Sequence, residues 1–107
     1  MIKKQYPETM TAKELYNMIE SPDIRKMKDA VNTEIKVSAV MLREDGEQLI
    51  TSIKDESGEV FATNSPTVYR SMLRLFDIGI PTVVEVITGT SRAGRTYTDI
   101  KAIDFKE

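Results

Sequence analysis

The apolar residues of this sequence change their spacing at Asn32, and that change limits what the chain can fold into. Within residues 11–20 they recur every three or four positions, as along one face of a helix. Within residues 35–42 they alternate with polar side chains, as in a strand that is buried on one face. A chain of 107 residues has room for one core. The pattern therefore predicts a single domain that consists of a helical N-terminal extension and a mainly β barrel, residues 1–32 and 33–107.

The N-terminal extension is expected to contain two helical stretches. Thr11 followed by Glu14 is a capping box, which opens a helix that the Ser-Pro pair at residues 21–22 ends. A second short turn or helix is expected through residues 23–30. Its outward positions carry three cations, Arg25, Lys26 and Lys28.

Five strands and a second helix are expected after residue 33. The strands fall at residues 35–42, 49–53, 59–63, 82–88 and 96–105. Between the third and fourth strands, Ser65 is a suitable N-cap, Pro66 suits the first helical position, and Gly79 is placed to end the helix in a left-handed conformation. This order is that of an OB-fold, a five-stranded barrel with one helix between strands 3 and 4. A small α+β sheet with one packed helix would give a similar order.

The composition excludes several classes of chemistry. The chain has no Cys, no His and no Trp, so it holds no disulfide, thiol nucleophile, Cys/His zinc site or imidazole-based triad. Its carboxylates show neither a catalytic pair nor the spacing of a Ca²⁺ loop. We therefore expect no enzyme activity, no metal and no cofactor. No stretch has the length of a signal peptide or of a membrane span, so we expect a cytoplasmic protein with no membrane partner.

Residues 88–101 concentrate positive charge in a sequence whose net charge is -2. They carry Arg92, Arg95 and Lys101 against one carboxylate, and Tyr97 lies on the polar face of the expected last strand. Single-stranded nucleic acid requires cations for its phosphates and flat side chains for its bases. The segment is therefore a candidate nucleic-acid site. The alternative is a solvated hairpin tip, with a tyrosine that covers its cross-strand neighbour.

Three further residues border the same expected groove. Arg43 and Lys54 lie near the ends of the first and second expected strands. Phe61 faces the groove and stacks on a base if Val60 and Ala62 point into the barrel, and it is a core residue if they do not. Nucleic acid should avoid the acidic turns nearby, whose carboxylates are Glu44, Asp45, Glu47, Asp55, Glu56 and Glu59. The cations of residues 25–28 form either a solvated face or a secondary backbone contact.

Three segments carry a family resemblance: residues 10–15 (MTAKEL), 58–65 (GEVFATNS) and 91–97 (SRAGRTY). In them the chain resembles the small single-stranded DNA-binding proteins of bacteriophages that infect Gram-positive hosts. The resemblance implies an OB-fold that coats single strands in the host cytoplasm during phage replication and recombination, usually as an oligomer, beside other phage replication or recombination proteins. Many bacterial single-strand binders recruit partners through a long acidic C-terminal tail. Residues 104–107 (DFKE) are at most a stub of such a tail, which leaves partner recruitment open.

The sequence thus predicts a non-catalytic single-stranded DNA-binding protein that is largely independent of base sequence. Arg92, Arg95 and Lys101 would hold phosphates, while Tyr97 and Phe61 would stack on bases. The alternative is a phage-encoded protein-interaction adaptor or inhibitor. Its support is the acidic stretch, which could mimic nucleic acid.

Overall fold

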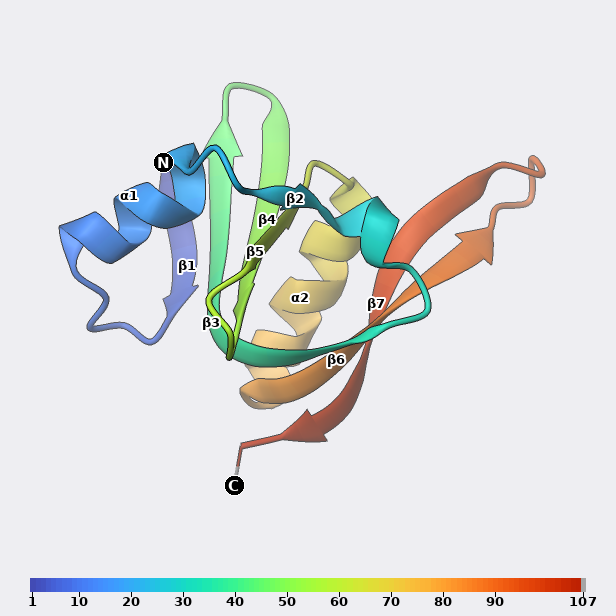
Figure 1. The fold of residues 1–107 in the computed structure, drawn as a ribbon. Helices are drawn as coiled ribbons and strands as arrows, with labels where there is room; N and C mark the ends of the chain where they lie inside the picture. The colour runs from blue at the N-terminus through green and yellow to red at the C-terminus, as the bar shows by residue number, and fades with distance from the viewer. Residues whose placement is uncertain (107) are drawn as a thin grey trace.

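A computed structural model describes residues 1–106 as a mainly β protein with two α-helices and one curled sheet (Figure 1). Its strands are β1 (Ile2–Tyr6), β2 (Arg25–Lys26), β3 (Glu34–Asp45), β4 (Gln48–Asp55), β5 (Val60–Thr63), β6 (Pro81–Thr90) and β7 (Thr96–Phe105). Its helices are α1 (Ala12–Glu20), the short 3-10 helix η1 (Met27–Ala30) and α2 (Pro66–Ile78). The predicted order of three strands, a helix and two strands is confirmed for β3 to β7.

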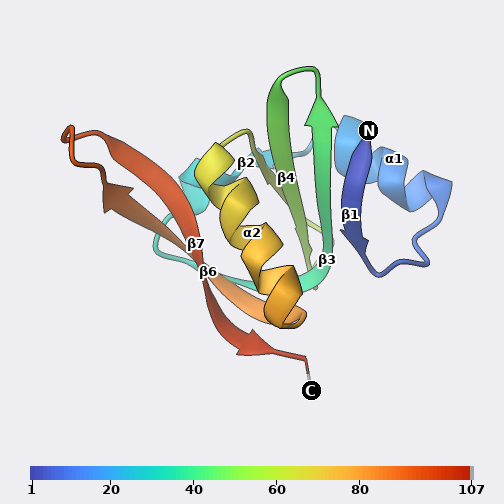
Figure 2. The ribbon, with the colours of Figure 1, turned by 180° about the vertical axis from the view of Figure 1, so that it is seen from behind.

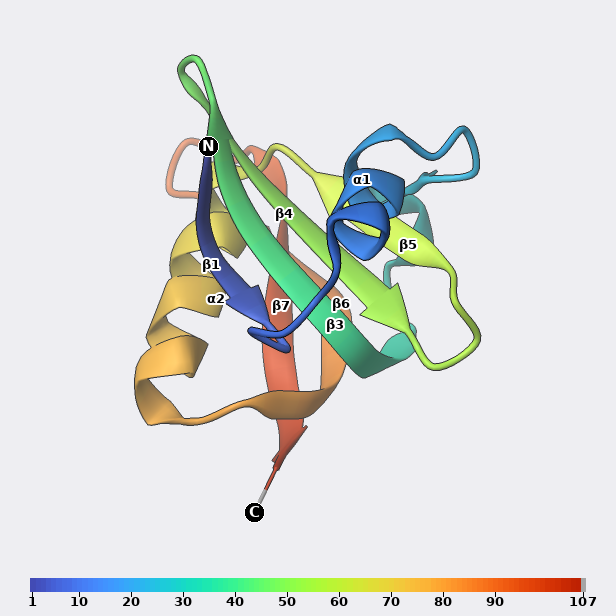
Figure 3. The same cartoon turned by 90° about the vertical axis from the view of Figure 1, so that its left-hand side faces the viewer.

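The sheet curls around β3, its longest strand (Figure 3). The strand order is β2-β5-β4-β3-β6-β7, and only the β2–β5 pair is parallel. One edge of β3 pairs first with β6, through residues 34–36, and then with β1, through residues 40–43. The result is a half-barrel. Within residues 1–106 no ladder joins β5 to β7, and β2 pairs with β5 instead.

The inner face of the half-barrel forms the main core. Helix α2 packs on this face through Val68, Tyr69 and Met72, all of which are buried. On the opposite side of the core, η1 contributes Met27 and Ala30. Figure 1 shows η1 nearer the viewer than α2, and Figure 2, seen from behind, shows α2 nearer. The core is therefore covered from two directions, by the predicted helix and by a segment of the N-terminal extension.

The outer face of β3 and β5 is covered by α1. Met18 of α1 packs with Ala39, Met41 and Val60 in a second, smaller cluster. The predicted N-cap is confirmed, since the Thr11 hydroxyl accepts the backbone N–H of Glu14 at 3.2 Å. Because α1 and α2 lie on opposite faces, these strands are buried on both faces.

Three local predictions need correction. The N-terminal extension is only partly helical, because residues 2–6 pair with β3 as a strand. The short turn or helix expected through residues 23–30 is confined to the 3-10 turn of residues 27–30, because residues 25–26 form the strand β2. Gly79 does end α2, but with φ 172°, which is extended backbone. Its N–H donates to the Leu75 carbonyl at 2.8 Å, so the helix end is satisfied without a left-handed residue.

Candidate nucleic-acid interface

The β6–β7 hairpin extends beyond the rest of the molecule (Figure 1). We call its outer part, residues 88–98, the arm. Ser91 holds the tip of the arm together: its carbonyl accepts the Gly94 N–H at 2.9 Å and its hydroxyl accepts the Arg95 N–H at 3.1 Å. Gly94 has φ 79°, a left-handed conformation that suits glycine. The turn is thus fixed by its own hydrogen bonds, and its arginines are not needed to close it.

The two arginines of the tip are free to meet an anion. Arg92 and Arg95 are both exposed, and neither forms an ion pair with any of residues 1–106. Two unneutralised guanidinium groups on a projecting turn favour contact with phosphate, which arginine binds through paired N–H donors.

Tyr97 lies on the arm with its ring over Gly89, its direct cross-strand partner. An ideal Cβ built on Gly89 would stand 2.5 Å from Cζ of the ring. The side chain is nevertheless 39% exposed. Tyr97 therefore covers its cross-strand neighbour, as one reading of the sequence had it, and still presents ring surface to solvent.

The next two charged residues of β7, Asp99 and Lys101, make contacts within the sheet and with α2. Asp99, on the same strand face by sequence, turns toward α2 and accepts the Ser71 hydroxyl at 2.6 Å. Lys101 is exposed, but it lies directly opposite Glu85 of β6. A carboxylate on the neighbouring strand lowers the attraction of Lys101 for phosphate.

Phe61 is a core residue, which excludes it as a stacking platform for bases. It is 5% exposed and belongs to the main core with α2, while Val60 points to the opposite face and contacts the α1 cluster. The guanidinium of Arg25 lies 5.3 Å from the centre of the Phe61 ring. The sequence was compatible with Phe61 in the groove or in the core, and in the structure Phe61 lies in the core.

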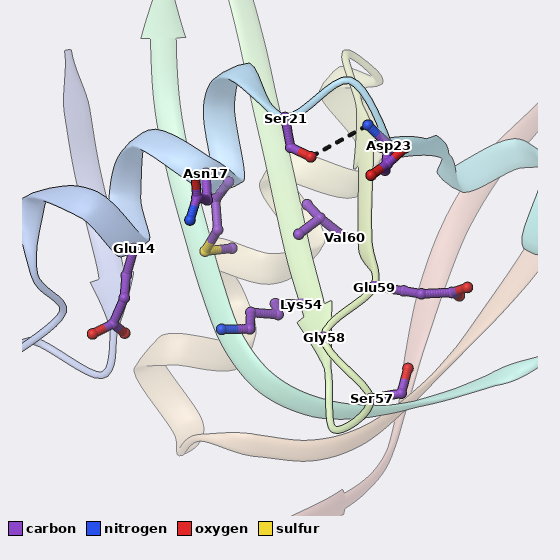
Figure 4. A pocket seen from close by; sticks show the side chains of 10 residues that line it. Glu14, Asn17, Ser21, Asp23, Lys54, Ser57, Gly58, Glu59 and Val60 are labelled. Atoms are coloured by element: carbon purple, nitrogen blue, oxygen red, sulfur yellow. Dashed lines mark hydrogen bonds between the residues drawn. The ribbon is translucent and has the colours of Figure 1, made fainter.

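Lys54 and Arg43 do not share one groove. Lys54 lines an acidic cavity of about 730 Å³ between α1 and the β4–β5 turn, beside Glu14, Asp23 and Glu59 (Figure 4). Of these carboxylates, Glu59 is paired with Arg25 at 3.1 Å. The remaining carboxylates make this cavity a poor place for a phosphate backbone.

Arg43 lies instead in a second cavity, of about 470 Å³, between η1 and the strands β3 to β5. We call it the η1 pocket. Its cations are Lys26, Lys28 and Arg43, and no carboxylate lines it. The lysine cluster was visible in the sequence as a possible backbone contact. That Arg43 joins it could not be read from spacing, because β3 and η1 meet only in the folded chain.

Neither α1 nor α2 has the length and hydropathy that crossing a membrane would require, within the residues that the structure describes. Comparison of the chain with protein-family models, with curated protein sequences and with solved structures finds no match.

Proposed function

We propose that the protein binds single-stranded DNA with little dependence on base sequence. The observation that carries the proposal is the arm: a projecting hairpin with two arginines at its tip that pair with no carboxylate of residues 1–106, and a partly exposed tyrosine just behind them. Phosphates contact Arg92 and Arg95, and a base stacks on Tyr97. Stacking of this kind contributes about 1–3 kcal/mol per base and tolerates any base, because every base has a π-face.

The architecture that fits this proposal is a variant of the OB-fold. The order of β3 to β7 with α2 between the third and fourth of these strands supports it, and so does the curled half-barrel. In that fold the loop between the last two strands borders the ligand groove. The arm is this loop. A protein that coats a long strand acts in many copies, and we expect neighbouring copies to associate on DNA during phage replication or recombination.

The proposal is tested by removing the two tip arginines together. Arg92→Ala with Arg95→Ala should weaken binding of a labelled dT oligonucleotide and flatten its salt dependence by about 1.4 in the slope of log K against log salt, for two lost phosphate contacts. Fluorescence anisotropy at several salt concentrations measures both quantities. The matched control is Lys13→Ala with Arg70→Ala, which removes two exposed cations from α1 and α2. Equal affinity and slope for the arginine variant and the native protein would refute the proposed site.

A protein-interaction module is the second candidate function. The acidic cavity favours it, since Glu14 and Asp23 form no ion pair within residues 1–106 and could meet a basic segment of another protein (Figure 4). The same titration separates the two candidates. A native protein that fails to bind the oligonucleotide even at low salt would favour the interaction module.

A further inference from the structure

The η1 pocket combines positive charge with the absence of any carboxylate in its lining. Lys26 and Lys28 are exposed and form no ion pair with residues 1–106, whereas their neighbour Arg25 is already paired with Glu59. The neighbouring cations of residues 25–28 therefore make different contacts. Arg25 pairs with the residue that precedes β5, whereas the two lysines line the pocket with charges that no carboxylate of residues 1–106 neutralises.

Arg43 is the unusual member of the pocket. Its side chain is only 18% exposed, and its nearest carboxylate, Asp45, lies 3.9 Å away and is itself 69% exposed. Its Nε–H is buried and has no partner within the described residues. A largely buried guanidinium with so little compensation is costly, and an anion with two acceptor oxygens would satisfy it.

The rest of the lining suits an organic group attached to that anion. Ile50 and Ala62 supply apolar surface, and Thr63 and Asn64 add a hydroxyl and an amide. The Thr63 hydroxyl accepts the Ser65 N–H at 3.2 Å, and its own proton remains free to donate. The volume of about 470 Å³ lies in the range of small-molecule sites.

We propose that the η1 pocket binds a single nucleotide, with its phosphate on Lys26, Lys28 and Arg43 and its nucleoside against Ile50, Thr63 and Asn64. The shared chemistry is a nucleoside phosphate, which either a free nucleotide or one residue of a DNA strand can supply. If the nucleotide is one residue of a DNA strand, the proposal rests on the proposed function. The η1 pocket then holds one nucleotide of the bound strand, at a contact separate from the arm.

The test follows backbone amide NMR signals of the native protein during titration with dTMP, with inorganic phosphate and with a dT oligonucleotide. We expect dTMP and the oligonucleotide to shift signals of residues 26–28 and 62–64, and phosphate to act more weakly. Lys26→Gln with Lys28→Gln should weaken dTMP and oligonucleotide binding about tenfold, the effect of losing two modest charge-assisted contacts. Lys13→Gln with Lys36→Gln, two exposed lysines elsewhere, should change neither.

The outcomes separate this proposal from the proposed function. Shifts confined to the arm, with the Lys26/Lys28 variant binding as the native protein does, would overturn the pocket and leave DNA binding intact. Equal responses to phosphate and dTMP would overturn the nucleotide assignment, because the nucleoside would then contribute nothing. Binding of dTMP in the pocket without binding of the oligonucleotide would support the pocket and overturn single-stranded DNA binding.

Discussion

The contact between Tyr97 and Gly89 makes the glycine part of the proposed binding surface. Across a two-stranded hairpin, an aromatic ring can lie on a glycine because no Cβ stands in its way. The backbone of Gly89 does not have positive φ, so alanine is compatible with its conformation. The space above Gly89 does not admit an alanine side chain, since a Cβ would stand 2.5 Å from Cζ and Oη of Tyr97. Only the position of the tyrosine ring should therefore respond to Gly89→Ala.

We predict that Gly89→Ala displaces the Tyr97 ring and weakens binding of a dT oligonucleotide, by up to the roughly 1–3 kcal/mol that base stacking supplies. A double-mutant cycle with Tyr97→Ala measures this. The double variant should bind no more weakly than Tyr97→Ala alone, because both changes remove the same contact. Additive losses in the cycle would show that Gly89 acts independently of the ring.

Thr51 is a residue that the fold tolerates at a cost. It is 0% exposed, and its hydroxyl has no hydrogen-bond partner within residues 1–106. Thr51→Val keeps the shape and removes the unsatisfied group, so we expect a gain of about 1 kcal/mol in the free energy of unfolding. Urea denaturation measures it. Ser71→Ala is the contrasting control, since it removes a hydroxyl that donates to Asp99 and should destabilise the protein. A loss of stability in Thr51→Val would mean that the Thr51 hydroxyl has a partner in solution.

At the level of single residues, the sequence could predict helix caps and the positions whose burial follows from the spacing of apolar residues. Thr11 and Ser65 cap their helices as expected, since a cap depends on three or four neighbouring residues. The orientation of Phe61 could not be predicted. Val60 and Phe61 are both buried on opposite faces of β5, because different helices cover the two faces. Alternation identifies the core face of a strand only where the other face meets water.

Among the elements, the strand β2 was not expected from the sequence, although the short turn or helix that follows it was. It pairs with β5 through only two residues, and η1 then contributes Met27, which is fully buried, to the main core. The strand is too short for an alternating pattern. β1 was missed for a related reason, because Ile2–Tyr6 carries two adjacent lysines and takes its place through pairing with β3. Both elements depend on contacts between distant parts of the chain.

We predict that Met27→Ala lowers the free energy of unfolding by about 2–5 kcal/mol, the usual cost of truncating a buried methionine. The physical reason is the cavity left in the core on the side opposite α2. Urea or thermal denaturation measures the loss. Ile78→Ala, at a side chain that is 74% exposed, serves as the surface control and should change stability little. A Met27→Ala variant as stable as the native protein would mean that η1 is not an integral part of the core.

For the whole molecule, the net charge of -2 conceals an uneven distribution. Arg92 and Arg95 lie on the arm, and Lys26, Lys28 and Arg43 line the η1 pocket, while the acidic cavity lies beside the β4–β5 turn. Near the end of β3, Glu44 is paired with Lys3 at 3.1 Å. A near-neutral sum therefore does not oppose DNA binding. In the proposed complex, DNA would contact a narrow surface that holds few cations.

This distribution predicts a moderate salt dependence and a preference for single strands. Five cations, namely Arg92, Arg95, Lys26, Lys28 and Arg43, can reach phosphate in the two sites, which sets the slope of log K against log salt no steeper than about -3.5 for single-stranded DNA. A duplex should bind more weakly, because its bases are already stacked and paired and cannot use Tyr97 or the η1 pocket. Titration of one labelled strand and its duplex at low and moderate salt measures both quantities. A steeper slope would require cations outside the two sites, and equal affinity for duplex and single strand would mean that phosphate contacts alone hold the DNA.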